Sequence, residues 1–465
     1  MNWDSFAQWG ARFADWGAEY HKTIRARPVR ARVKPGDIAA QLPAKPPETG
    51  EPMEQIFADF EAIIMPGMTH HQHPGFFAYF PTNATPPSIL AEYLIANLSA
   101  QCMIWQTAPA ANELETVVLD WLRQALGLPE EFQGVVQGSA SEATLVAALT
   151  MRERALGWTG NSTGLSTRER LRVYTTLEVH SSIDRAMWVS GIGQDNLVRI
   201  PTQGPLRSMD TDRLRDAIEQ DIAAGYRPAG IIACVGGTST GAVDQIADVV
   251  AVAREFDLYV HVDAAWAGNA MLCPEFRTLW TGVEGADSVV FNPQKWMGGQ
   301  FDGSMHFVRT PEELNNTLSI EPEYLKTHGK EGFRNYSEWS ISLGRRFRAL
   351  KYWFLIRAYG LEEFRNRIRN HVIWSGEVCE AIRRMDGFEI VTEPVLSLFT
   401  FRCPGDDMMQ QHLVDAINDD GRIYITQGLH KGRKMIRFQV GQFDATREDV
   451  LAAAGVINDV WKALK

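Results

Sequence analysis

Between about residues 85 and 370, short apolar runs of strand length alternate with longer helix-like stretches. Short runs that are apolar throughout are typical of strands buried on both faces, and connecting helices cover such strands in parallel sheets. The alternation therefore predicts an α/β fold with a mostly parallel sheet. The runs lie at residues 134–136, 172–174, 230–235, 258–262 and 288–291.

The pattern changes after about residue 376. A helix-like segment, a strand-like run at 396–401, a second helix, a strand-like run at 434–440 and a final helix follow one another. This order predicts a small α+β domain with antiparallel strands. We therefore expect an N-terminal segment at residues 1–84, a large domain at 85–375 and a small C-terminal domain at 376–465.

The first twenty residues carry large aromatic side chains at alternating spacings of three and four, which places them on one stripe of a helix. An apolar stripe of this size must be covered, either by the chain's own core or by a second subunit. The pattern alone favours neither. The stripe consists of Phe6, Trp9, Phe13, Trp16 and Tyr20.

Composition limits the choice of partners and compartment. The 465 residues include 46 Lys and Arg against 57 Asp and Glu, a net charge of −11, which disfavours nucleic acid and anionic membrane as partners. A basic, proline-rich stretch at 28–52 is therefore interpreted as a solvated or partner-facing linker. Five scattered cysteines without a CxxC pair favour a reducing compartment. With no apolar run of about 18 residues and no secretory signal, we expect a soluble cytoplasmic protein.

Each strand-like run of the large domain ends in a polar or glycine-containing stretch. In open α/β sheets, ligands bind outside the carboxyl ends of the strands, so these stretches are expected to line one active-site rim. They lie at residues 138–141, 180–182, 236–241, 263–265 and 292–295.

Lys295 and Asp263 are the strongest chemical signal on this rim. Lys295 follows an apolar strand and precedes Trp296, where partial desolvation can lower the pKa of its amine and let it form an imine. A lone lysine is more often a surface residue. Asp263, however, ends a neighbouring run, and a carboxylate opposite an imine-forming lysine is what pyridoxal phosphate requires at its ring nitrogen.

Other rim residues support the same cofactor with less specificity. Gly138 to Ser141 follow a strand and lead into a helix, so backbone N–H groups and hydroxyls there can bind a phosphate, although an ordinary serine cap explains them equally. His180 can stack on a ring or transfer a proton, or be structural. The glycine-rich 236–241 lacks dinucleotide spacing and is interpreted as a tight turn.

Metal binding is the weaker alternative. His70, His71 and His73 cluster, and His261 precedes Asp263 by two residues on one strand. No further ligand set completes either site, and the lysine interpretation already uses Asp263. We expect no metal.

Residues 292–296, 261–268 and 137–144 together resemble the pyridoxal-phosphate-dependent aromatic-L-amino-acid decarboxylases, the group II decarboxylases. Residues 73–82, 113–117 and 343–351 look like further signatures of that family. The resemblance implies a type I pyridoxal-phosphate fold, similar to aspartate aminotransferase. It also implies a homodimer whose N-terminal helices wrap the partner, which favours the second subunit as the cover for the aromatic stripe.

The resemblance assigns the cofactor residues position by position. Lys295 would be the Schiff-base lysine, Asp263 the partner of the pyridine nitrogen, and Ala265 and His180 would pack on opposite faces of the ring. The phosphate would be held by Ala140, Ser141 and Asn292, and Thr238 would lie beside the ring.

The resemblance also assigns catalytic and substrate residues. Tyr324 falls at the position of a loop tyrosine that protonates the carbanion. The aromatic substrate would be enclosed by Tyr79, Phe80, Pro81, Thr82, His71, Gly344 and Met103, with Met103 reaching across from the other subunit. Two departures bear on substrate preference: Gln294 replaces a histidine usual before the lysine, and His71 replaces a tryptophan common in animal relatives.

We therefore expect decarboxylation of tryptophan, phenylalanine, tyrosine or dopa to the arylalkylamine and CO₂. The alternative within the family is an aromatic acetaldehyde synthase, which typically has phenylalanine at the position of Tyr324. A decarboxylase of non-aromatic amino acids would need a cationic pocket residue that the sequence does not reveal. A non-catalytic homologue would be expected to have lost Lys295 or Asp263, and both are present.

Overall fold

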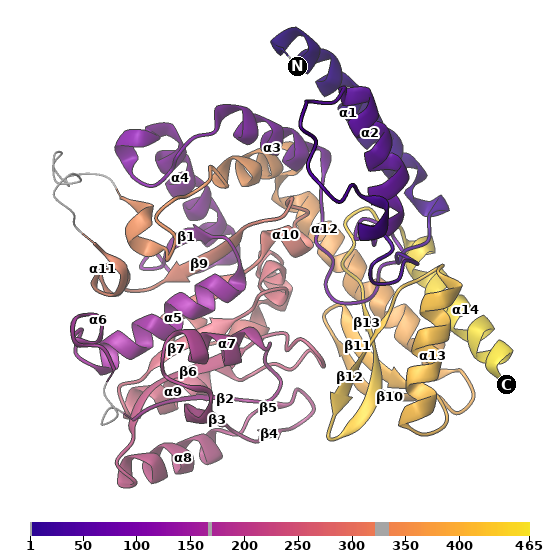
Figure 1. Cartoon of the computed structure of the whole chain (residues 1–465). Coiled ribbons are helices and arrows are strands. Elements are labelled where there is room, and N and C mark those ends of the chain that lie inside the picture. The colour runs from indigo at the N-terminus through magenta and orange to yellow at the C-terminus, as the bar shows by residue number, and fades with distance from the viewer. Residues whose placement is uncertain (1, 166–169, 321–333) are drawn as a thin grey trace. The chain divides into compact units, whose positions relative to one another are not determined.

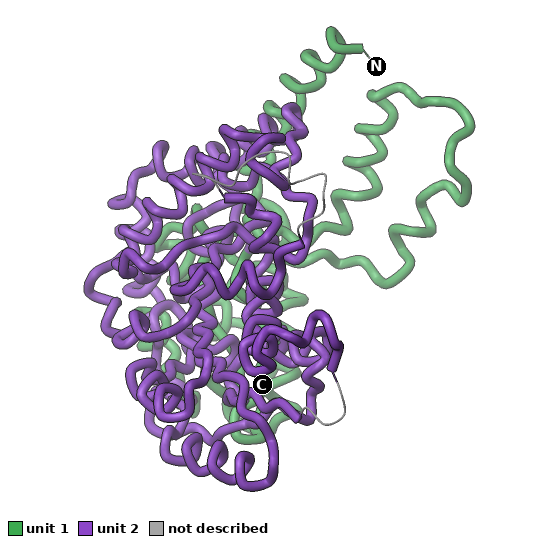
Figure 2. The backbone as a smooth tube through the Cα atoms, turned by 90° about the vertical axis from the view of Figure 1, so that its left-hand side faces the viewer, with its two compact units in different colours: residues 1–81, 377–390, 401–465 green, residues 82–376, 391–400 purple. Residues whose placement is uncertain are grey.

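The computed structural model describes residues 2–165, 170–320 and 334–465 (Figure 1). The chain divides into two compact units, coloured separately in Figure 2. Unit 1 comprises 1–81, 377–390 and 401–465, and unit 2 comprises 82–376 and 391–400. The division of the chain into three parts at residues 84 and 375 stays a prediction.

Unit 2 contains a seven-stranded sheet in the order β1-β9-β8-β7-β6-β2-β3. The pairs β8·β7, β7·β6, β6·β2 and β2·β3 are parallel, whereas β9 is antiparallel to both β8 and β1. The prediction of an α/β fold with a mostly parallel sheet is confirmed. The strands are β1 (Gln133–Gln137), β2 (Leu171–Thr175), β3 (Leu197–Arg199), β6 (Arg227–Cys234), β7 (Tyr259–Asp263), β8 (Ser288–Phe291) and β9 (Ser304–Val308), and the short β4 (Thr202–Gln203) and β5 (Ser208–Met209) pair separately.

All five predicted runs of the large domain form strands, but β3 and β9 were not predicted. All five residues of β9 are buried, yet Ser304 and His306 interrupt its apolar pattern. The three residues of β3 are too few for a periodicity to appear. Both strands were missed because the prediction relied on uninterrupted apolar runs.

Helices cover the sheet of unit 2, and Figure 1 shows α5 crossing it. Ala147, Ala148 and Met151 of α5 pack with Ile183 and Met187 of α7 in one buried cluster over the sheet. None of the helices in the described ranges is long and apolar enough to span a bilayer. The helices are α3 (Pro86–Leu98), α4 (Pro109–Leu126), α5 (Ala140–Ala155), α6 (Gly160–Thr163), α7 (Ser182–Val189), α8 (Thr211–Ala223), α9 (Ile246–Glu255), α10 (Pro293–Trp296), α11 (Pro311–Leu318) and α12 (Ala349–Arg383), the last interrupted at Gly360.

The C-terminal part of the chain forms α13 (Asp407–Asp420), α14 (Arg447–Leu464) and a four-stranded sheet in the order β10-β11-β13-β12. The predicted runs correspond to β11 (Leu398–Arg402) and β13 (Arg433–Gln439), and β12 (Thr426–His430) pairs antiparallel with β13. The predicted α+β character is confirmed. Neither β12 nor β10 (Glu389–Val395) was predicted, because both are partly exposed and carry polar residues between the apolar ones.

The predicted N-terminal helix exists as α1 (Trp3–Thr23), capped by Asn2 and Ser5. Within unit 1, α2 (Met53–Asp59) covers part of its aromatic stripe, since Phe57 lies 5.8 Å from Trp9 and 5.3 Å from Phe13 between ring centroids. Phe13 nevertheless remains 44% exposed. The chain's own residues therefore cover the stripe in part.

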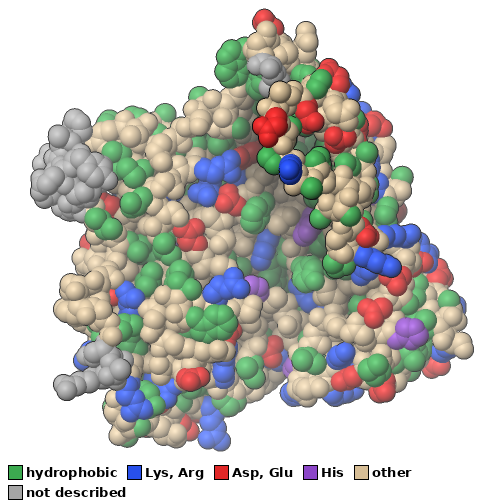
Figure 3. Space-filling view, viewed as in Figure 1, with side chains coloured by type: hydrophobic (Ala, Val, Ile, Leu, Met, Phe, Trp, Pro, Cys, Tyr) green, Lys and Arg blue, Asp and Glu red, His purple; other side chains and the backbone are tan. Residues whose placement is uncertain are grey.

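The basic stretch that follows α1 contacts the C-terminal elements of unit 1. Arg25 forms an ion pair of 2.7 Å with Asp449 at the start of α14, and Arg32 donates to the carbonyls of Asp419 and Asp420 at the end of α13. A guanidinium at a helix C-terminus is stabilised by the helix dipole. On the face shown in Figure 3, Lys and Arg are interspersed with Asp and Glu over the surface.

Two histidines, on β7 and β9, are completely buried in unit 2. The rings of His261 and His306 lie 5.8 Å apart, and Nδ1 of His261 pairs with the hydroxyl of Ser288 at 2.7 Å. Neither ring nitrogen of His306 has a hydrogen-bond partner among the described residues. Burial lowers the pKa of His306 to about 3 and that of His261 well below its usual value. Both rings are therefore neutral in the folded protein at pH 7.

We expect His306→Leu to weaken the pH dependence of stability. In the unfolded chain a histidine titrates near 6.5, so below about that pH the unfolded state binds a proton that folded His306 excludes. Between pH 7.5 and 5.5 the wild type should lose about 1.4 kcal/mol more unfolding free energy than His306→Leu. Urea unfolding at the two pH values measures this difference. Met305→Leu, a buried substitution in the same strand, should behave like the wild type, and equal losses in wild type and His306→Leu would contradict the expectation.

Candidate active site

The carboxyl ends of β6, β7 and β8 are held side by side by their register. Asp263, the last residue of β7, lies opposite Cys234 of β6 and Val290 of β8. Beyond the strands, the backbone N–H of Val235 donates to the carbonyl of Asp263 at 3.0 Å, and that of Asn292 donates to Ala265 at 2.8 Å. The predicted stretches 236–241, 263–265 and 292–295 therefore begin at one edge of the sheet.

The stretch after β1 joins the same edge through β9. Gln137, the last residue of β1, lies opposite Ser304 of β9. The hydroxyl of Ser304 in turn donates to Oδ1 of Asn292 at 2.6 Å. Residues 138–141 thus begin close to Asn292, as expected if both hold one phosphate.

Lys295 lies on the short helix α10, half-buried between the buried residues Gln294 and Trp296. Its backbone is fixed from both sides, because its N–H donates to Asn292 and its carbonyl accepts from the side-chain amide of Asn83. The indole N–H of Trp296 donates to Nδ1 of His371 at 2.9 Å. The backbone of Lys295 is therefore held in place by hydrogen bonds on both sides.

Asp263 is buried, and its Oδ1 accepts a hydrogen bond of 3.1 Å from the backbone N–H of Ala265. Among the described residues, no hydrogen bond to its second oxygen is formed. A buried carboxylate with one oxygen available can accept from a protonated ring nitrogen.

His180, in the loop after β2, is within electrostatic reach of both residues. Loss of surrounding water lowers the pKa of His180; the charge of Asp263 raises it and that of Lys295 lowers it. The backbone N–H of Ser182 donates to Nδ1 at 3.1 Å, so the neutral ring carries its proton on Nε2. The structure therefore brings Lys295, Asp263 and His180 to one edge of the sheet.

At the start of α5, the residue that caps the helix is distinct from the residues that could bind a phosphate. Ser139 is the N-cap of α5, and its hydroxyl accepts from the N–H of Glu142 at 3.2 Å. Ala140 and Ser141 occupy the first turn, where backbone N–H groups have no acceptor within the helix. Ser139 thus accounts for the cap, and the exposed Ser141 is free to bind an anion at a helix N-terminus.

The stretch 236–241 is the tight turn that the sequence predicted. The N–H groups of Gly236 and Gly237 both donate to the carbonyl of Ala242 at 2.8 Å. Gly236 has φ +89°, and a Cβ there would lie 2.5 Å from that of Ala267, so only glycine fits. Thr238 is exposed at the tip of this turn, and Ala265 is half-buried beside Asp263.

Three of the expected pocket residues, Thr82, Met103 and Gly344, belong to unit 2. The N–H of Cys102 donates to the carbonyl of Arg345 at 2.9 Å, which places the segments containing Met103 and Gly344 next to each other. A Cβ at Gly344 would lie 3.3 Å from Nε2 of Gln101.

The other pocket residues, His71, Tyr79, Phe80 and Pro81, belong to unit 1. His71 lies 4.4 Å from Phe76 between ring centroids, and Phe80 packs closely against Gly441. Tyr79 is 58% exposed. Their role in a substrate pocket stays a prediction, and Tyr324 lies outside the described residues.

Sequence reasoning missed several residues that hold this rim. Asn83 fixes the carbonyl of Lys295, His371 fixes Trp296, and Glu178 accepts a hydrogen bond from the buried hydroxyl of Thr240. Each is a polar residue far in sequence from its partner. Glu178 offered one signal, a carboxylate two residues before His180.

In the described part of the chain, no group of three or more His, Cys, Asp or Glu side chains is arranged to hold a metal ion. Of the histidine cluster, His70 pairs with the hydroxyl of Tyr20 at 2.9 Å, and Nδ1 of His73 accepts from the N–H of Gly75. These histidines have structural partners.

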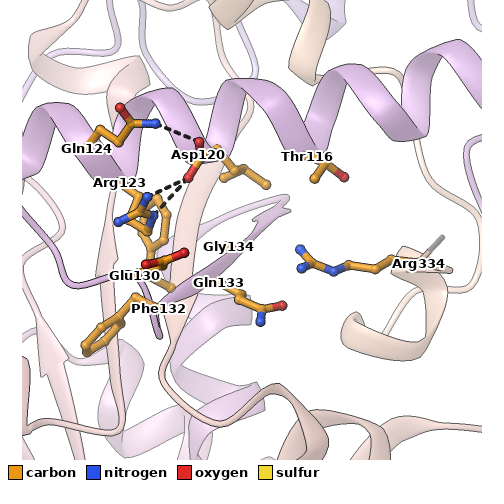
Figure 4. A pocket seen from close by; sticks show the side chains of 11 residues that line it. Thr116, Asp120, Arg123, Gln124, Glu130, Phe132, Gln133, Gly134 and Arg334 are labelled. Carbon is orange, nitrogen blue, oxygen red and sulfur yellow. Dashed lines mark hydrogen bonds and ion pairs between the residues drawn. The ribbon is translucent and has the colours of Figure 1, made fainter. Parts of the chain in front are cut away.

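A polar cavity of about 500 Å³ lies elsewhere in unit 2 (Figure 4). Asp120 and Arg123 of α4 line one side, where they form an ion pair of 2.8 Å, and Arg334 projects from another. Gln133 and Gly134 in its wall are the first residues of β1, at the amino end of the strand. The cavity is therefore at the opposite end of β1 from the rim and is not the candidate site.

Residues 35–404 match the model of the pyridoxal-dependent decarboxylase conserved domain. The chain is 39% identical over 454 residues to the aromatic-L-amino-acid decarboxylase of Mus musculus, covering 95% of this chain and 94% of that relative. It is 37% identical over 457 residues to the phenylacetaldehyde synthase of Arabidopsis thaliana, covering 95% and 92%. The solved structure of Oryza sativa TDC with PLP and tryptamine superposes with a TM-score of 0.96 at 32% identity, covering 100% and 99% of the two chains.

The chain belongs to the pyridoxal-dependent decarboxylase family. It has the type I pyridoxal-phosphate fold and is a carboxy-lyase whose cofactor is pyridoxal 5′-phosphate. The rim fits that group chemically: Lys295 supplies an amine for the aldehyde, Asp263 a buried carboxylate for the ring nitrogen, and α5 a helix N-terminus for the phosphate.

Proposed function

We propose that this enzyme decarboxylates aromatic L-amino acids to the corresponding arylalkylamines and CO₂. The observation that carries the proposal is the placement of Lys295, Asp263 and His180 at one edge of the sheet. Similarity to an aromatic-L-amino-acid decarboxylase over almost the whole chain supports an aromatic substrate.

In the proposed mechanism the bound cofactor supplies an electron sink that accepts the electron pair released when CO₂ leaves. Lys295 would hold the cofactor through its amine. Asp263 keeps the ring nitrogen protonated through its available oxygen, and the burial of Asp263 strengthens this charge interaction. The N–H groups at the start of α5, the hydroxyl of Ser141 and the side chain of Asn292 hold the phosphate.

The remaining residues position groups or move protons. His180, whose pKa is lowered by loss of surrounding water, would pack on the face of the cofactor opposite Ala265, and its Nε2 carries a proton that can be directed toward the substrate. Thr238 would lie beside the cofactor. Tyr324 would give its phenolic proton to the α-carbon of the substrate after CO₂ has left.

The substrate pocket is proposed from Tyr79, Phe80, Pro81 and Thr82 together with His71, Met103 and Gly344. Aromatic and apolar walls with few charges suit an aromatic side chain. Gly344 is proposed to leave space for a large aromatic side chain of the substrate, and a Cβ at this position would lie 3.3 Å from Nε2 of Gln101.

Purified enzyme with pyridoxal phosphate should release CO₂ and amine from at least one of tryptophan, phenylalanine, tyrosine and dopa. Lys295→Ala should reduce this rate at least about 10³-fold and remove the visible band near about 420 nm that a lysine-bound cofactor gives. Product identification by mass spectrometry and absorbance spectra measure both effects. Turnover of none of the four amino acids would refute the aromatic substrate, and an unchanged band would refute the role of Lys295.

The second candidate function is an aromatic acetaldehyde synthase, favoured by the 37% identity to the phenylacetaldehyde synthase of Arabidopsis thaliana. In that reaction O₂ and water are consumed, O₂ is reduced to hydrogen peroxide, and CO₂, ammonia and the aldehyde are released. The two reactions diverge after CO₂ has left, at the carbanion stage. A nearby proton donor favours formation of the amine. The presence of Tyr324 supports the decarboxylase.

Tyr324→Phe should divert product from amine to aldehyde, with peroxide formed in equal amount, because the phenolic proton is lost while the aromatic ring is kept. We expect at least about a hundredfold fall in the amine-to-aldehyde ratio, the lower end of the range for loss of a general acid. Amine, aldehyde and peroxide are quantified from one reaction mixture. Tyr336→Phe is the matched control, since Tyr336 is buried against Thr116, and it should keep the wild-type ratio. An amine yield from Tyr324→Phe equal to that of the wild type would exclude the proposed proton donor.

We also propose a homodimer, supported by the exposed face of α3. Ala91 and Ile95 of this helix are buried against Leu350, yet Leu90 and Leu94 on another face are 59% and 42% exposed. A helix that is apolar on two faces is typical of one that is covered on both sides. A second copy of the chain is proposed to cover this face and to contribute Met103 to its partner's pocket.

The double variant Leu90→Arg/Leu94→Arg should halve the mass measured by light scattering, because two guanidinium groups would have to be buried in the interface. Ile373→Arg, at an apolar residue of α12 that is 56% exposed, is the control and should retain the wild-type mass. A wild type that is monomeric would contradict the homodimer, and a double variant that stays dimeric would contradict the assignment of the interface to α3.

A cytoplasmic location is proposed from the cysteines. Cys102, Cys234, Cys273, Cys379 and Cys403 are all free and buried. Unpaired thiols of this kind suit a reducing compartment.

A further inference from the structure

The loop after β2, which carries His180, and the turn after β6, which carries Thr238, are in direct contact. A Cβ placed on Gly237 would lie 2.7 Å from the backbone oxygen of Glu178, so the two backbones approach as closely as glycine permits. The side chain of Glu178 in the first loop accepts a hydrogen bond from the hydroxyl of Thr240 in the second.

Thr240 is completely buried and is held at both its polar ends. Its hydroxyl donates to the carboxylate of Glu178, and its carbonyl accepts from the guanidinium of Arg207 at 2.7 Å. Arg207 is itself buried, and its other terminal nitrogen donates to the carbonyl of Pro205 at 2.9 Å. Burial lowers the pKa of Arg207, and the negative charge of Glu178 opposes that effect. Glu178 and Arg207 are thus opposite charges on either side of one threonine.

Each loop is also held by contacts of its own. Arg199 donates to the carbonyl of Thr176 at 2.7 Å and pairs with Asp184, which fixes the first residue of the His180 loop and the start of α7. The turn after β6 is closed internally, because the N–H groups of Gly236 and Gly237 donate to Ala242 and that of Gly241 donates to Gly237. The bond between Glu178 and Thr240 is therefore placed where it can fix the tips of both loops relative to each other.

We propose that Glu178 is a positioning residue which, through its hydrogen bond to Thr240, holds the His180 loop against the Thr238 turn. This inference rests on the proposed roles of His180 on the face of the cofactor ring and of Thr238 beside it. Glu178 touches neither substrate nor cofactor in this account. It acts by fixing the distance between two residues that contact the ring from neighbouring strands.

The test uses the cofactor-loaded enzyme and variants at both ends of the bond. Glu178→Ala and Thr240→Val remove the acceptor and the donor, whereas Glu178→Gln and Thr240→Ser keep the hydrogen bond. Glu255→Ala is the matched control, since Glu255 forms an exposed ion pair of 2.8 Å with Arg215 on α8 and α9, away from the rim. For each protein, cofactor content, the visible circular-dichroism band of bound pyridoxal phosphate, kcat and KM are measured.

Glu178→Ala and Thr240→Val should each weaken the circular-dichroism band per bound cofactor and lower kcat about tenfold, while KM changes less than about threefold, because misorientation of the ring affects chemistry more than substrate binding. Glu178→Gln, Thr240→Ser and Glu255→Ala should stay within about twofold of wild type. The double variant Glu178→Ala/Thr240→Val should be no worse than the worse single variant, since both remove one interaction.

Wild-type dichroism and kcat in both Glu178→Ala and Thr240→Val would overturn the inference, as would strictly additive effects in the double variant. Failure of the proposed function gives a different result, namely a wild type that produces no CO₂ from any aromatic amino acid. In that case the dichroism of the variants still reports whether Glu178 orients the bound cofactor.

Discussion

The candidate site depends on the register of β6, β7 and β8 at their carboxyl ends. Asp263 lies opposite Cys234 and Val290, and hydrogen bonds from Val235 to Asp263 and from Ala264 to Val290 continue the pairing one residue beyond the strands. A shift of one residue would turn the side chain of Asp263 to the other face of the sheet. Because the strands are buried on both faces, such a shift would also expose or overpack apolar side chains, so the core fixes the position of the carboxylate.

The three titratable residues of the candidate site differ in how deeply they are buried. Asp263 is buried and accepts a hydrogen bond through Oδ1, Lys295 is half-buried, and His180 is exposed. A buried ion pair also contacts β1. Arg345 donates to both carboxylate oxygens of Glu115 and to the carbonyl of Val136. Removing one partner of such a pair costs about 3–5 kcal/mol. This pair connects the segment containing Gly344 to β1, the strand that leads into the start of α5.

The apolar pattern of the sequence could predict most strands of the large sheet. It could not predict the hydrogen bonds that fix the loops after those strands. Five strands of the large sheet are continuous apolar runs, and polar stretches follow them at their carboxyl ends. That these stretches line an active site stays a prediction. Strand β9 was missed because Ser304 and His306 interrupt its pattern, and only the fold reveals that both side chains are buried. Asn83, Glu178 and His371 could not be predicted as supports, because a hydrogen bond between residues tens to hundreds of positions apart leaves no local periodicity.

Gln294 illustrates how the structure changes the meaning of a sequence departure. Gln294 directly precedes Lys295, at a position where the family that the sequence resembles usually has histidine. From the sequence alone, this departure was interpreted as bearing on substrate preference. In the fold its Oε1 accepts from the backbone N–H of Gly303 at 2.7 Å, and its own carbonyl accepts from the N–H of Asn83. It therefore connects the lysine helix to the start of β9 and to the segment that fixes the carbonyl of Lys295. A residue in that role acts on the placement of the lysine backbone, so its effect is expected on the reaction with every substrate alike.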